Sequence, residues 1–349
     1  MPDQTHSPAQ VTLRDVAKRA GVSAMTVSRA LGQRDGIAEE TRGRIEKIAA
    51  KLGYRPDPEI AKLMHHVRSR NRPRFKSVIC GLTTRPQDSR EPYTLAVIAG
   101  ARARAEALGY GFLVMHVSPE PTAWPGLQRV LLNRGVQGLL LLPQHRPIDL
   151  AGLCSWEKFS VVAATTSVLA PAVNRVTPDH FSNGLLLCRE LAARGYRRLG
   201  YVTSSEHDMR VNHVLDAATM WHGRREAVGQ VDPLIMVELS AERLIAWFRR
   251  EKPDAVIGSN ARELEWVRQT LKLRMRGKVG LACMTTAGSV MKDVSGIDER
   301  PREVGIVAVD LLAGMVTTRV GGLPLAPTST GVLGGWKEGR SCRGRSTDD

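Results

Sequence analysis

Two patterns of apolar and polar positions divide the chain. Residues 11–56 carry small apolar residues at helical spacing, which predicts three short helices. From Ser77 onward, continuous runs of valine, isoleucine and leucine alternate instead with longer stretches of helical period. Such runs are typical of parallel strands that helices cover on both faces. The pattern therefore predicts a small all-α domain followed by a larger α/β domain.

The apolar runs and the stretches between them locate the elements of the larger domain. We expect strands over residues 77–84, 112–117, 138–144, 160–167, 198–205, 234–239, 255–260 and 279–286. We expect helices near residues 94–108, 125–134, 182–194, 241–251, 261–274 and 301–318. Several of these helices are followed by glycine, as at Gly109, Gly135 and Gly195, which is a frequent helix stop.

The first two helices of the N-terminal domain meet at a tight turn. Thr12 and Asp15 form a Thr-x-x-acid start signal for the first helix. Gly21 stands where that helix ends, and Ser23 is a strong N-cap for the second. The second helix has small apolar residues on its inner side and polar or basic residues outside. Such a helix can lie in a DNA major groove while a neighbour holds it, so the spacing predicts a helix-turn-helix.

A glycine turn between two helices also occurs in ordinary helical bundles. Here a third helix follows over residues 39–52. Through TVSRAL and EETRGRIEKIAAKLGYRP, the run from Val11 to Pro56 resembles the DNA-binding headpiece of the LacI/GalR family of bacterial transcription regulators. Ala38 departs from the family, which usually offers a serine cap at the start of the third helix. We expect this departure to cost on the order of 1 kcal/mol.

The resemblance implies a set of DNA contacts from the headpiece. Met25 would contact a thymine methyl group and Arg29 a guanine or a phosphate, while Ala24 packs close to the base edges. Hydroxyl groups would hold phosphates, namely those of Thr12, Ser23, Thr26 and Ser28. Tyr54, near the end of the headpiece, completes the DNA contacts that we expect there.

Residues 57–76 follow the headpiece, and in this family the equivalent segment is a short hinge helix that orders on operator DNA. A leucine of that hinge wedges into the minor groove, and counting on from Pro56 puts it at Leu63. Alternatively, Leu63 and its apolar neighbours face another part of the protein. Arginines follow at alternate positions, namely Arg68, Arg70, Arg72 and Arg74. They either make further phosphate contacts or form part of a solvated linker.

The charge balance points to a polyanionic partner. The chain has a formal net charge of +15, and residues 1–76 hold 16 Lys and Arg against 8 Asp and Glu, about half of the surplus. Composition alone also fits RNA or anionic membranes, whereas the helix-turn-helix favours duplex DNA. Together with the resemblance, which implies a small-molecule effector and a second copy of the chain, the expected partners include an operator duplex and no membrane.

The resemblance also implies the fold of the core, two doubly wound parallel-sheet subdomains like those of periplasmic binding proteins with a ligand cleft between them. We expect residues 77–174 and 301–321 in the first subdomain, and residues 175–300 and 322–340 in the second. The crossovers would lie near residues 170–178, 296–301 and 320–325. Residues 1–10 and 341–349 are expected to be a disordered leader and tail.

Ligands of parallel α/β sheets bind beyond the carboxyl ends of the strands. Hydroxyl and amide groups at those ends suit a sugar or nucleoside, although strand ends are polar in most proteins. The family places an effector-binding arginine where Arg210 stands, and Asp179 either binds ligand or caps the next helix. Ala261 departs from the family, which often has an aspartate there. The effector contacts that we expect are Arg85, Tyr93, Gln144, Thr165, Asp179, Arg210 and Asn260.

Enzyme signatures and metal signatures do not occur in the sequence. It has no Gly-x4-Gly-Lys-Ser/Thr loop, no Gly-x-Ser-x-Gly elbow, no His-Glu-x-x-His and no complete Gly-x-Gly-x-x-Gly after a strand. The five cysteines are scattered, which favours reduced thiols in the cytoplasm over disulfides or zinc. We therefore expect no catalytic residues, metal or cofactor, and a dimeric repressor controlled by a metabolite. The alternatives are a non-specific architectural DNA-binding protein and an enzyme fused to a DNA-binding headpiece.

Overall fold

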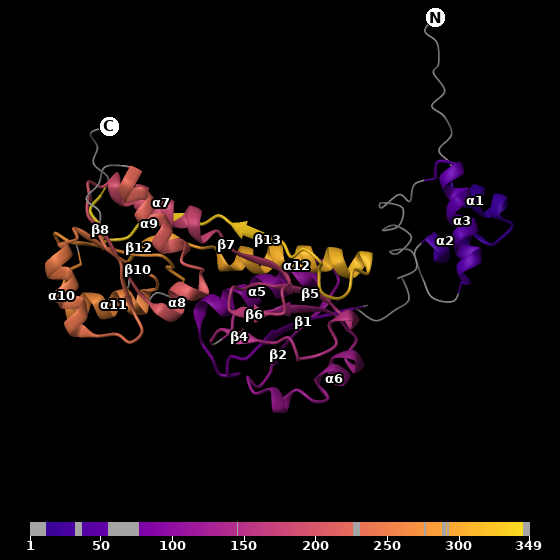
Figure 1. The fold of residues 1–349 in the computed structure, drawn as a ribbon, viewed down its shortest axis with the longest axis horizontal. Helices are drawn as coiled ribbons and strands as arrows, with labels where there is room; N and C mark the ends of the chain where they lie inside the picture. Colours follow the sequence, from indigo (N-terminus) through magenta and orange to yellow (C-terminus); the bar gives the residue numbers. More distant parts are fainter. Residues whose placement is uncertain are drawn as a thin grey trace, which may run out of the picture. The chain divides into compact units, whose positions relative to one another are not determined.

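The computed structural model describes residues 12–31, 37–54, 77–144, 146–225, 231–275, 277–287, 291 and 293–344. The chain forms two compact units, residues 1–73 and residues 74–349 (Figure 1). Each unit has its own hydrophobic core. No helix among the described residues combines the length and the apolar character needed to cross a membrane.

The N-terminal unit contains α1 (Leu13–Ala20), α2 (Ala24–Leu31) and α3 (Glu39–Lys51). All three helices contribute to one small core, in which Val16, Val27 and Ile45 are fully buried. The apolar residues that recur at helical spacing in the sequence form this core, because each helix covers the apolar side of the other two. The helices that we predicted in this unit are therefore present.

The larger unit begins with a six-stranded parallel sheet in the order β13-β7-β5-β3-β1-β2. Its strands are β1 (Val78–Thr83), β2 (Gly111–His116), β3 (Val136–Leu141), β5 (Ser160–Ala163), β7 (Asn174–Pro178) and β13 (Ser329–Val332). The helices that pack on it are α5 (Pro92–Ala107), α6 (Leu127–Asn133) and α12 (Pro301–Thr318). We call this assembly the first subdomain.

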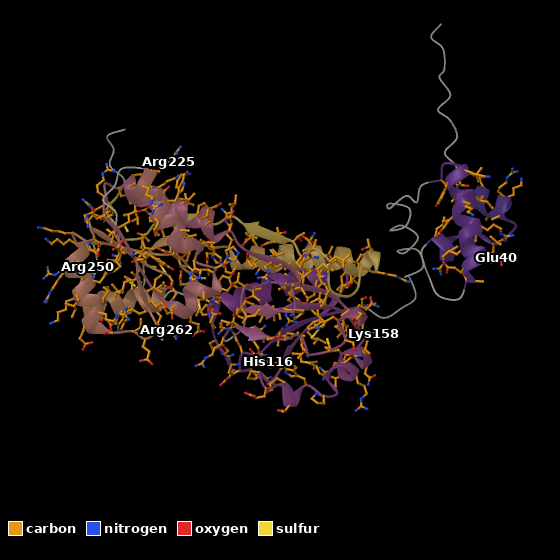
Figure 2. The ribbon with its side chains drawn as sticks, in the orientation of Figure 1. Glu40, His116, Lys158, Arg225, Arg250 and Arg262 are labelled. Atoms are coloured by element: carbon orange, nitrogen blue, oxygen red, sulfur yellow. The ribbon has the colours of Figure 1, made fainter. Side chains whose placement is uncertain are left out.

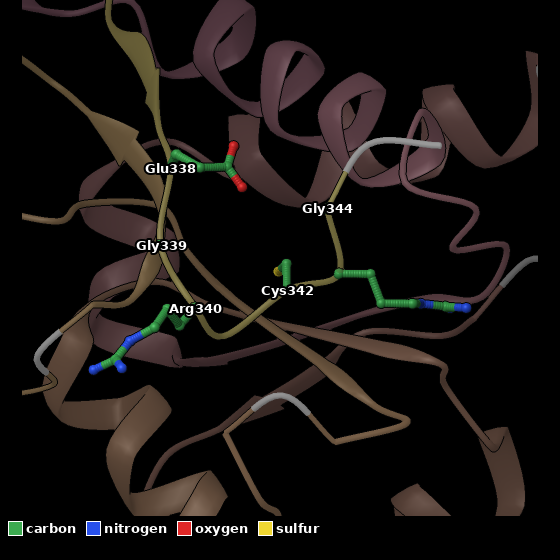
Figure 3. Close-up of a pocket in the computed structure, with 6 residues that line it drawn as sticks. Glu338, Gly339, Arg340, Cys342 and Gly344 are labelled. Atoms are coloured by element: carbon green, nitrogen blue, oxygen red, sulfur yellow. The ribbon is translucent and has the colours of Figure 1, made fainter. Parts of the chain in front are cut away.

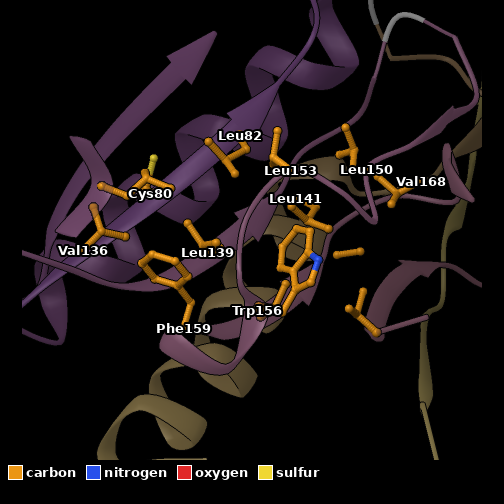
Figure 4. Packing of buried hydrophobic residues seen from close by; sticks show 14 of the residues in the cluster. Cys80, Leu82, Val136, Leu139, Leu141, Leu150, Leu153, Trp156, Phe159 and Val168 are labelled. Atoms are coloured by element: carbon orange, nitrogen blue, oxygen red, sulfur yellow. The ribbon is translucent and has the colours of Figure 1, made fainter. Parts of the chain in front are cut away.

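The pleat of β3 shows why the apolar runs are continuous. Leu139 and Leu141 face one side of the sheet, where they pack with α6, Trp156 and Phe159 (Figure 4). Leu140, between them, faces the other side and packs with α5 and α12. Because both faces of the sheet are covered, every position of the strand core must be apolar.

A second six-stranded sheet has the order β14-β12-β11-β10-β8-β9 and is parallel except where β14 meets β12. Its strands are β8 (Leu199–Ser204), β9 (Leu234–Met236), β10 (Ala255–Gly258), β11 (Gly280–Cys283), β12 (Ser295–Asp298) and β14 (Gly335–Lys337). One face of this sheet is covered by α7 (His180–Ala192) and α9 (Val214–Arg225). The short helix α8 (Ser205–Arg210) directly follows β8. On the other face lie α10 (Ala241–Glu251) and α11 (Ala261–Thr270).

We call the second sheet and its helices the second subdomain. Charged side chains such as Arg250 on α10 and Arg262 on α11 extend away from it (Figure 2). Outside the two large sheets, β4 (Ile148–Asp149) and β6 (Val168–Ala170) form a small parallel pair, and η1 (Pro121–Ala123) and η2 (Trp156–Lys158) are single 3-10 turns.

The chain passes between the two sheets at three places, after β7, after β12 and after β13. The middle passage lies where we expected it, between Asp298 and Pro301. The sheet pairing puts β7 and β13 in the first sheet, whereas we assigned residues 175–178 and 322–332 to the second subdomain. The strand β13 has a polar, exposed sequence at the sheet edge, so it gives no apolar run that would reveal it.

Candidate functional site

The start of α1 is fixed by a capping box. The backbone N–H of Thr12 donates to Asp15 Oδ2 at 2.8 Å, and Thr12 Oγ1 donates to the same oxygen at 2.6 Å. These hydrogen bonds lower the pKa of the exposed Asp15 carboxyl. The Thr12 hydroxyl is thus engaged within the headpiece, and its contact with a DNA phosphate stays a prediction.

The turn between α1 and α2 depends on Gly21. Its φ of 65° lies in the left-handed region, which a residue without a Cβ adopts at little cost. The turn then brings the N–H of Val22 to the carbonyl of Ala17 at 3.2 Å. Ser23 begins α2, because its Oγ accepts the N–H of Thr26 at 3.1 Å. The two hydroxyl groups of Ser23 and Thr26 also contact each other at 2.9 Å.

The helix α2 has the inward side that the sequence predicted. Val27 and Ala30 are completely buried against α1 and α3. At 100° per residue, positions 25 and 29 fall on the side of the helix opposite Val27. The side chains of four predicted contacts on α2 lie outside the described part of the structure: Ala24, Met25, Ser28 and Arg29.

The remaining headpiece predictions concern its end. Tyr54 is half-buried against the headpiece core, so it also packs within the domain. Leu63 lies outside the described residues. At the start of α3, Ala38 provides no side-chain hydrogen bond to the helix, and the acidic Glu39 and Glu40 occupy the first turn.

In the larger unit, the structure brings together Arg85, Tyr93 and Arg210 from the expected effector contacts. Arg85 follows β1, Tyr93 lies in the first turn of α5, and Arg210 is the last residue of α8. Burial lowers the pKa of Arg85, with the charge of Arg210 acting in the same direction and that of Glu91 against it. Burial and the charge of Glu299 raise the pKa of Tyr93, which Arg210 opposes. Arg210 of the second subdomain therefore lies near enough to these two residues of the first for its charge to act on both.

Two other expected contacts use their polar groups within the first sheet. Gln144 is buried, and its Oε1 accepts the N–H of Thr84 at 2.6 Å while its Nε2 donates to the carbonyls of Leu82 and Leu142. Thr165 is also buried and accepts the N–H of Ser167 at 3.0 Å. Both side chains hold the strand ends together, and a role in ligand binding stays a prediction for each.

Asp179 and Asn260 are helix caps. Asp179 Oδ1 accepts the N–H of Ser182 at 3.0 Å and so begins α7. Asn260 Oδ1 accepts two N–H groups at the start of α11, from Arg262 at 3.1 Å and Glu263 at 3.0 Å. The capping role that we considered for Asp179 is therefore present, and ligand binding by either residue is not tested.

Three further residues of this region were not predicted. His207 lies one turn before Arg210 on α8, and the guanidinium of Arg210 donates to its Nδ1. His180 Nδ1 lies 3.1 Å from Oε1 of Glu299, a carboxylate that is only 7% exposed. Burial, Arg210 and His180 lower the pKa of His207 to about 3, so its imidazole is neutral at pH 7. These positions have no motif in the sequence, since a lone histidine or glutamate beside a helix start is common.

A different feature lies at the C-terminal segment. A partly open cavity of about 310 Å³ is lined by Glu338, Gly339, Arg340, Cys342, Arg343 and Gly344 (Figure 3). Glu338 pairs with Arg194, and the guanidinium of Arg343 lies 4.2 Å from the Tyr196 ring. These contacts hold the segment against the second subdomain, so we assign this cavity a structural role. No set of three histidine, cysteine or acidic side chains within the described ranges is arranged to hold a metal ion.

Comparison with known proteins places the headpiece in a family. Residues 12–57 match the family model described as "Bacterial regulatory proteins, lacI family". The HTH-type transcriptional regulator MalR of Streptococcus pneumoniae is 26% identical over 200 residues, which cover 56% of this chain and 58% of MalR. The HTH-type transcriptional repressor CytR of Escherichia coli is 27% identical over 195 residues, covering 56% of this chain and 54% of CytR. The matched part thus spans little more than half the length of these relatives.

Solved structures share the fold over nearly the whole chain. The Lac repressor dimer bound to operator and the anti-inducer ONPF has a TM-score of 0.55 at 19% identity, covering 96% of this chain and 100% of the repressor chain. The complex of the transcriptional regulator CelR with cellobiose has a TM-score of 0.57 at 18% identity, and the match covers 95% of this chain and 100% of the CelR chain. The helix-turn-helix headpiece thus belongs to the LacI family of bacterial regulatory proteins, and the two parallel-sheet α/β subdomains share the fold of these solved structures.

Proposed function

We propose that this protein is a sequence-specific regulator of transcription that binds a pseudopalindromic operator as a dimer and acts as a repressor. The turn between α1 and α2 carries this proposal, because Gly21 ends α1 and Ser23 begins α2 two residues later, which is the short connection of a helix-turn-helix. The basic surplus of the chain supports a DNA partner, which would be met in the cytoplasm.

The recognition helix would read one half-site. With Val27 and Ala30 buried, the opposite side of α2 is left for the major groove, and it carries positions 25 and 29. A thioether at position 25 suits a thymine methyl group, and a guanidinium at position 29 suits the acceptor atoms of guanine. Two such helices related by a two-fold axis would read the two halves of a palindrome.

The larger unit would sense a metabolite. Its two parallel-sheet subdomains carry polar residues at the carboxyl ends of their strands, where ligands of such sheets bind. A sugar or related small molecule bound there would change the relative arrangement of the subdomains, and thereby the affinity for the operator. Its effect on that affinity can be no larger than its differential affinity for the two arrangements.

The test of the operator is selection of bound duplexes from a random pool by the purified full-length protein near physiological salt. We expect one palindromic motif. Met25→Ala and Arg29→Met should each relax selection at one position of the half-site and cost about 10- to 100-fold in affinity for the selected site. Arg19→Met is the matched control, because Arg19 is exposed on α1 and its loss should weaken binding to all sequences equally.

Two other outcomes would replace this proposal. Tight, salt-sensitive binding without any motif would indicate the architectural DNA-binding protein instead. Turnover of a bound metabolite would indicate an enzyme joined to a DNA-binding headpiece. The regulators with which the chain aligns support neither alternative.

A further inference from the structure

Two arginines from different subdomains lie within range of each other's charge. Arg85 follows β1 of the first sheet, and Arg210 ends α8 of the second subdomain. They lie close enough for the charge of Arg210 to oppose the protonated form of Arg85. The Arg85 side chain is only 14% exposed, so water screens this repulsion poorly. Two partly buried cations that repel each other in this way favour the binding of an anion.

The carboxylate nearest to Arg85 compensates it only in part. Glu91 Oε2 lies 3.8 Å from Nη2 of Arg85, beyond hydrogen-bond distance. Its oxygens are taken up by the start of α5, where they accept the N–H groups of Tyr93 at 3.0 Å and Thr94 at 2.8 Å. The Nε of Arg85 is buried and has no hydrogen-bond partner in the part of the chain that the structure describes.

Arg210 has still less compensation. No described carboxylate forms an ion pair with it, and its guanidinium donates to the neutral His207. Glu299, the other acid near Tyr93, is buried next to His180. Because Nδ1 of His207 accepts a hydrogen bond, its Nε2 carries the proton, and the Tyr93 hydroxyl also remains protonated. Besides the carboxylates of Glu91 and Glu299, the site therefore presents two further donors, the hydroxyl of Tyr93 and the Nε2–H of His207.

We propose that the effector of this protein is an anion whose carboxylate or phosphate group binds between the guanidinium groups of Arg85 and Arg210. This inference rests on the proposed function, since it assigns the chemistry of the ligand that the core would sense. A guanidinium fork holds either anion with two parallel hydrogen bonds. A neutral sugar would accept hydrogen bonds from these donors, but it would leave the positive charges of the two arginines without a negative partner. Sugar acids and sugar phosphates combine the required charge with the hydroxyl groups that the strand ends suit.

The test uses the full-length protein and matched ligands that differ in charge. The unfolding temperature and calorimetric affinity are measured with glucose, gluconate and glucose 6-phosphate, and with ribose and ribose 5-phosphate. We expect at least one anion to raise the unfolding temperature while its neutral partner at equal concentration does not. A comparison of gluconate with glucose 6-phosphate shows whether the site binds a carboxylate or a phosphate group. Arg85→Gln and Arg210→Gln should each lower the affinity for that anion at least tenfold.

Control variants remove the same charge elsewhere. Arg129→Gln on α6 and Arg224→Gln on α9 change exposed arginines of the two subdomains, and the anion should bind to both as to the native protein. Binding of the anion to R85Q and R210Q with native affinity would overturn the proposal. So would a panel in which only the neutral sugars bind.

A second measurement needs no ligand. The Arg85 side chain is only 14% exposed, its Nε has no partner among the described residues, and the charge of Arg210 opposes its protonated form. Ligand-free R85Q should therefore unfold at the same temperature as the native protein or a higher one. A fall of several degrees would show that Arg85 holds the fold together, and the proposal would be abandoned. Operator selection on the same preparation keeps the two proposals separate. If a palindrome emerges while the anion tests fail, only the effector class is wrong.

Discussion

Gly100 of α5 and Gly305 of α12 allow the two helices to cross with their backbones in contact. A Cβ atom on Gly100 would lie 2.0 Å from the carbonyl oxygen of Arg302, and a Cβ on Gly305 would lie 2.1 Å from that of Val97. Each glycine thus lies against a carbonyl group of the opposite helix, about one turn before that helix's own glycine. Because α5 starts next to Tyr93 and α12 starts after Glu299, this crossing fixes two sides of the candidate effector site.

We expect Gly305→Ala to lower the free energy of unfolding by about 3 kcal/mol, the upper end for an overpacked core. The added methyl group would meet backbone atoms, which cannot move aside like the end of a flexible side chain. Urea unfolding, compared at unchanged slope, measures the difference. A value near zero would mean that α5 and α12 are packed less closely.

Gly314→Ala is the matched control on the same helix. Gly314 is exposed, and no atom lies within 4 Å of the position that its Cβ would take. Here alanine should stabilise the protein by about 0.5–1 kcal/mol, because it restricts the unfolded chain and favours the helix. Opposite signs at the two glycines would separate close packing from helix propensity.

The start of α3 offers a stabilising change in the headpiece. Ala38 occupies the N-cap position without a side-chain hydrogen bond, and its backbone is extended as a serine cap requires. Ala38→Ser should therefore raise headpiece stability by about 1 kcal/mol. Hydrogen exchange of the α3 amides measures the gain. Ala50→Ser, at an exposed position in the last turn of α3, should give no gain, and equal gains from both would argue against capping.

Arg194 holds the C-terminal segment to the second subdomain. Its side chain is 3% exposed, contacts Glu190 at 2.6 Å and Glu338, and lies 4.4 Å from the Trp336 ring. We expect Arg194→Met to cost about 2 kcal/mol, below the value for a fully buried pair because Glu338 is partly exposed. Limited proteolysis should then cut the segment around residues 335–344 faster. Arg189→Met, an exposed position on α7, should change neither quantity.

The sequence predicted the elements with strong local signals. The helices over 241–251 and 301–318 have the expected bounds, since Ser240 caps one and Pro301 begins the other. The helices α8 and α9 were missed. The buried side of α9 consists of Leu215, Ala218 and His222, which is too weak an apolar stripe to predict a helix.

The candidate site shows a different limit. Sequence patterns placed Arg85 and Arg210 each beyond a strand, but their proximity depends on the passages of the chain between two sheets. Gln144 was expected to bind ligand because it follows a strand, yet the fold uses its amide to satisfy buried backbone groups. Local patterns reveal which side chains are polar, and only the assembled sheets show which of them are already paired.

The neutral state of His207 gives a prediction on pH. Its pKa is about 3 in the folded protein against 6.5 for an unperturbed histidine. Between these values the unfolded chain binds a proton that the folded chain does not, so folding becomes less favourable as the pH falls below 6.5. The loss is about 1.4 kcal/mol per pH unit, or about 2 kcal/mol at pH 5. Above pH 6.5 His207 contributes no such loss.

His207→Gln should remove this dependence, because a glutamine amide oxygen can still accept from Arg210 but does not titrate. Between pH 7 and pH 5, the native protein should lose about 2 kcal/mol more stability than H207Q in urea unfolding. Equal losses in the two proteins would mean that His207 becomes protonated in the folded state, which would add a further positive charge near Arg210.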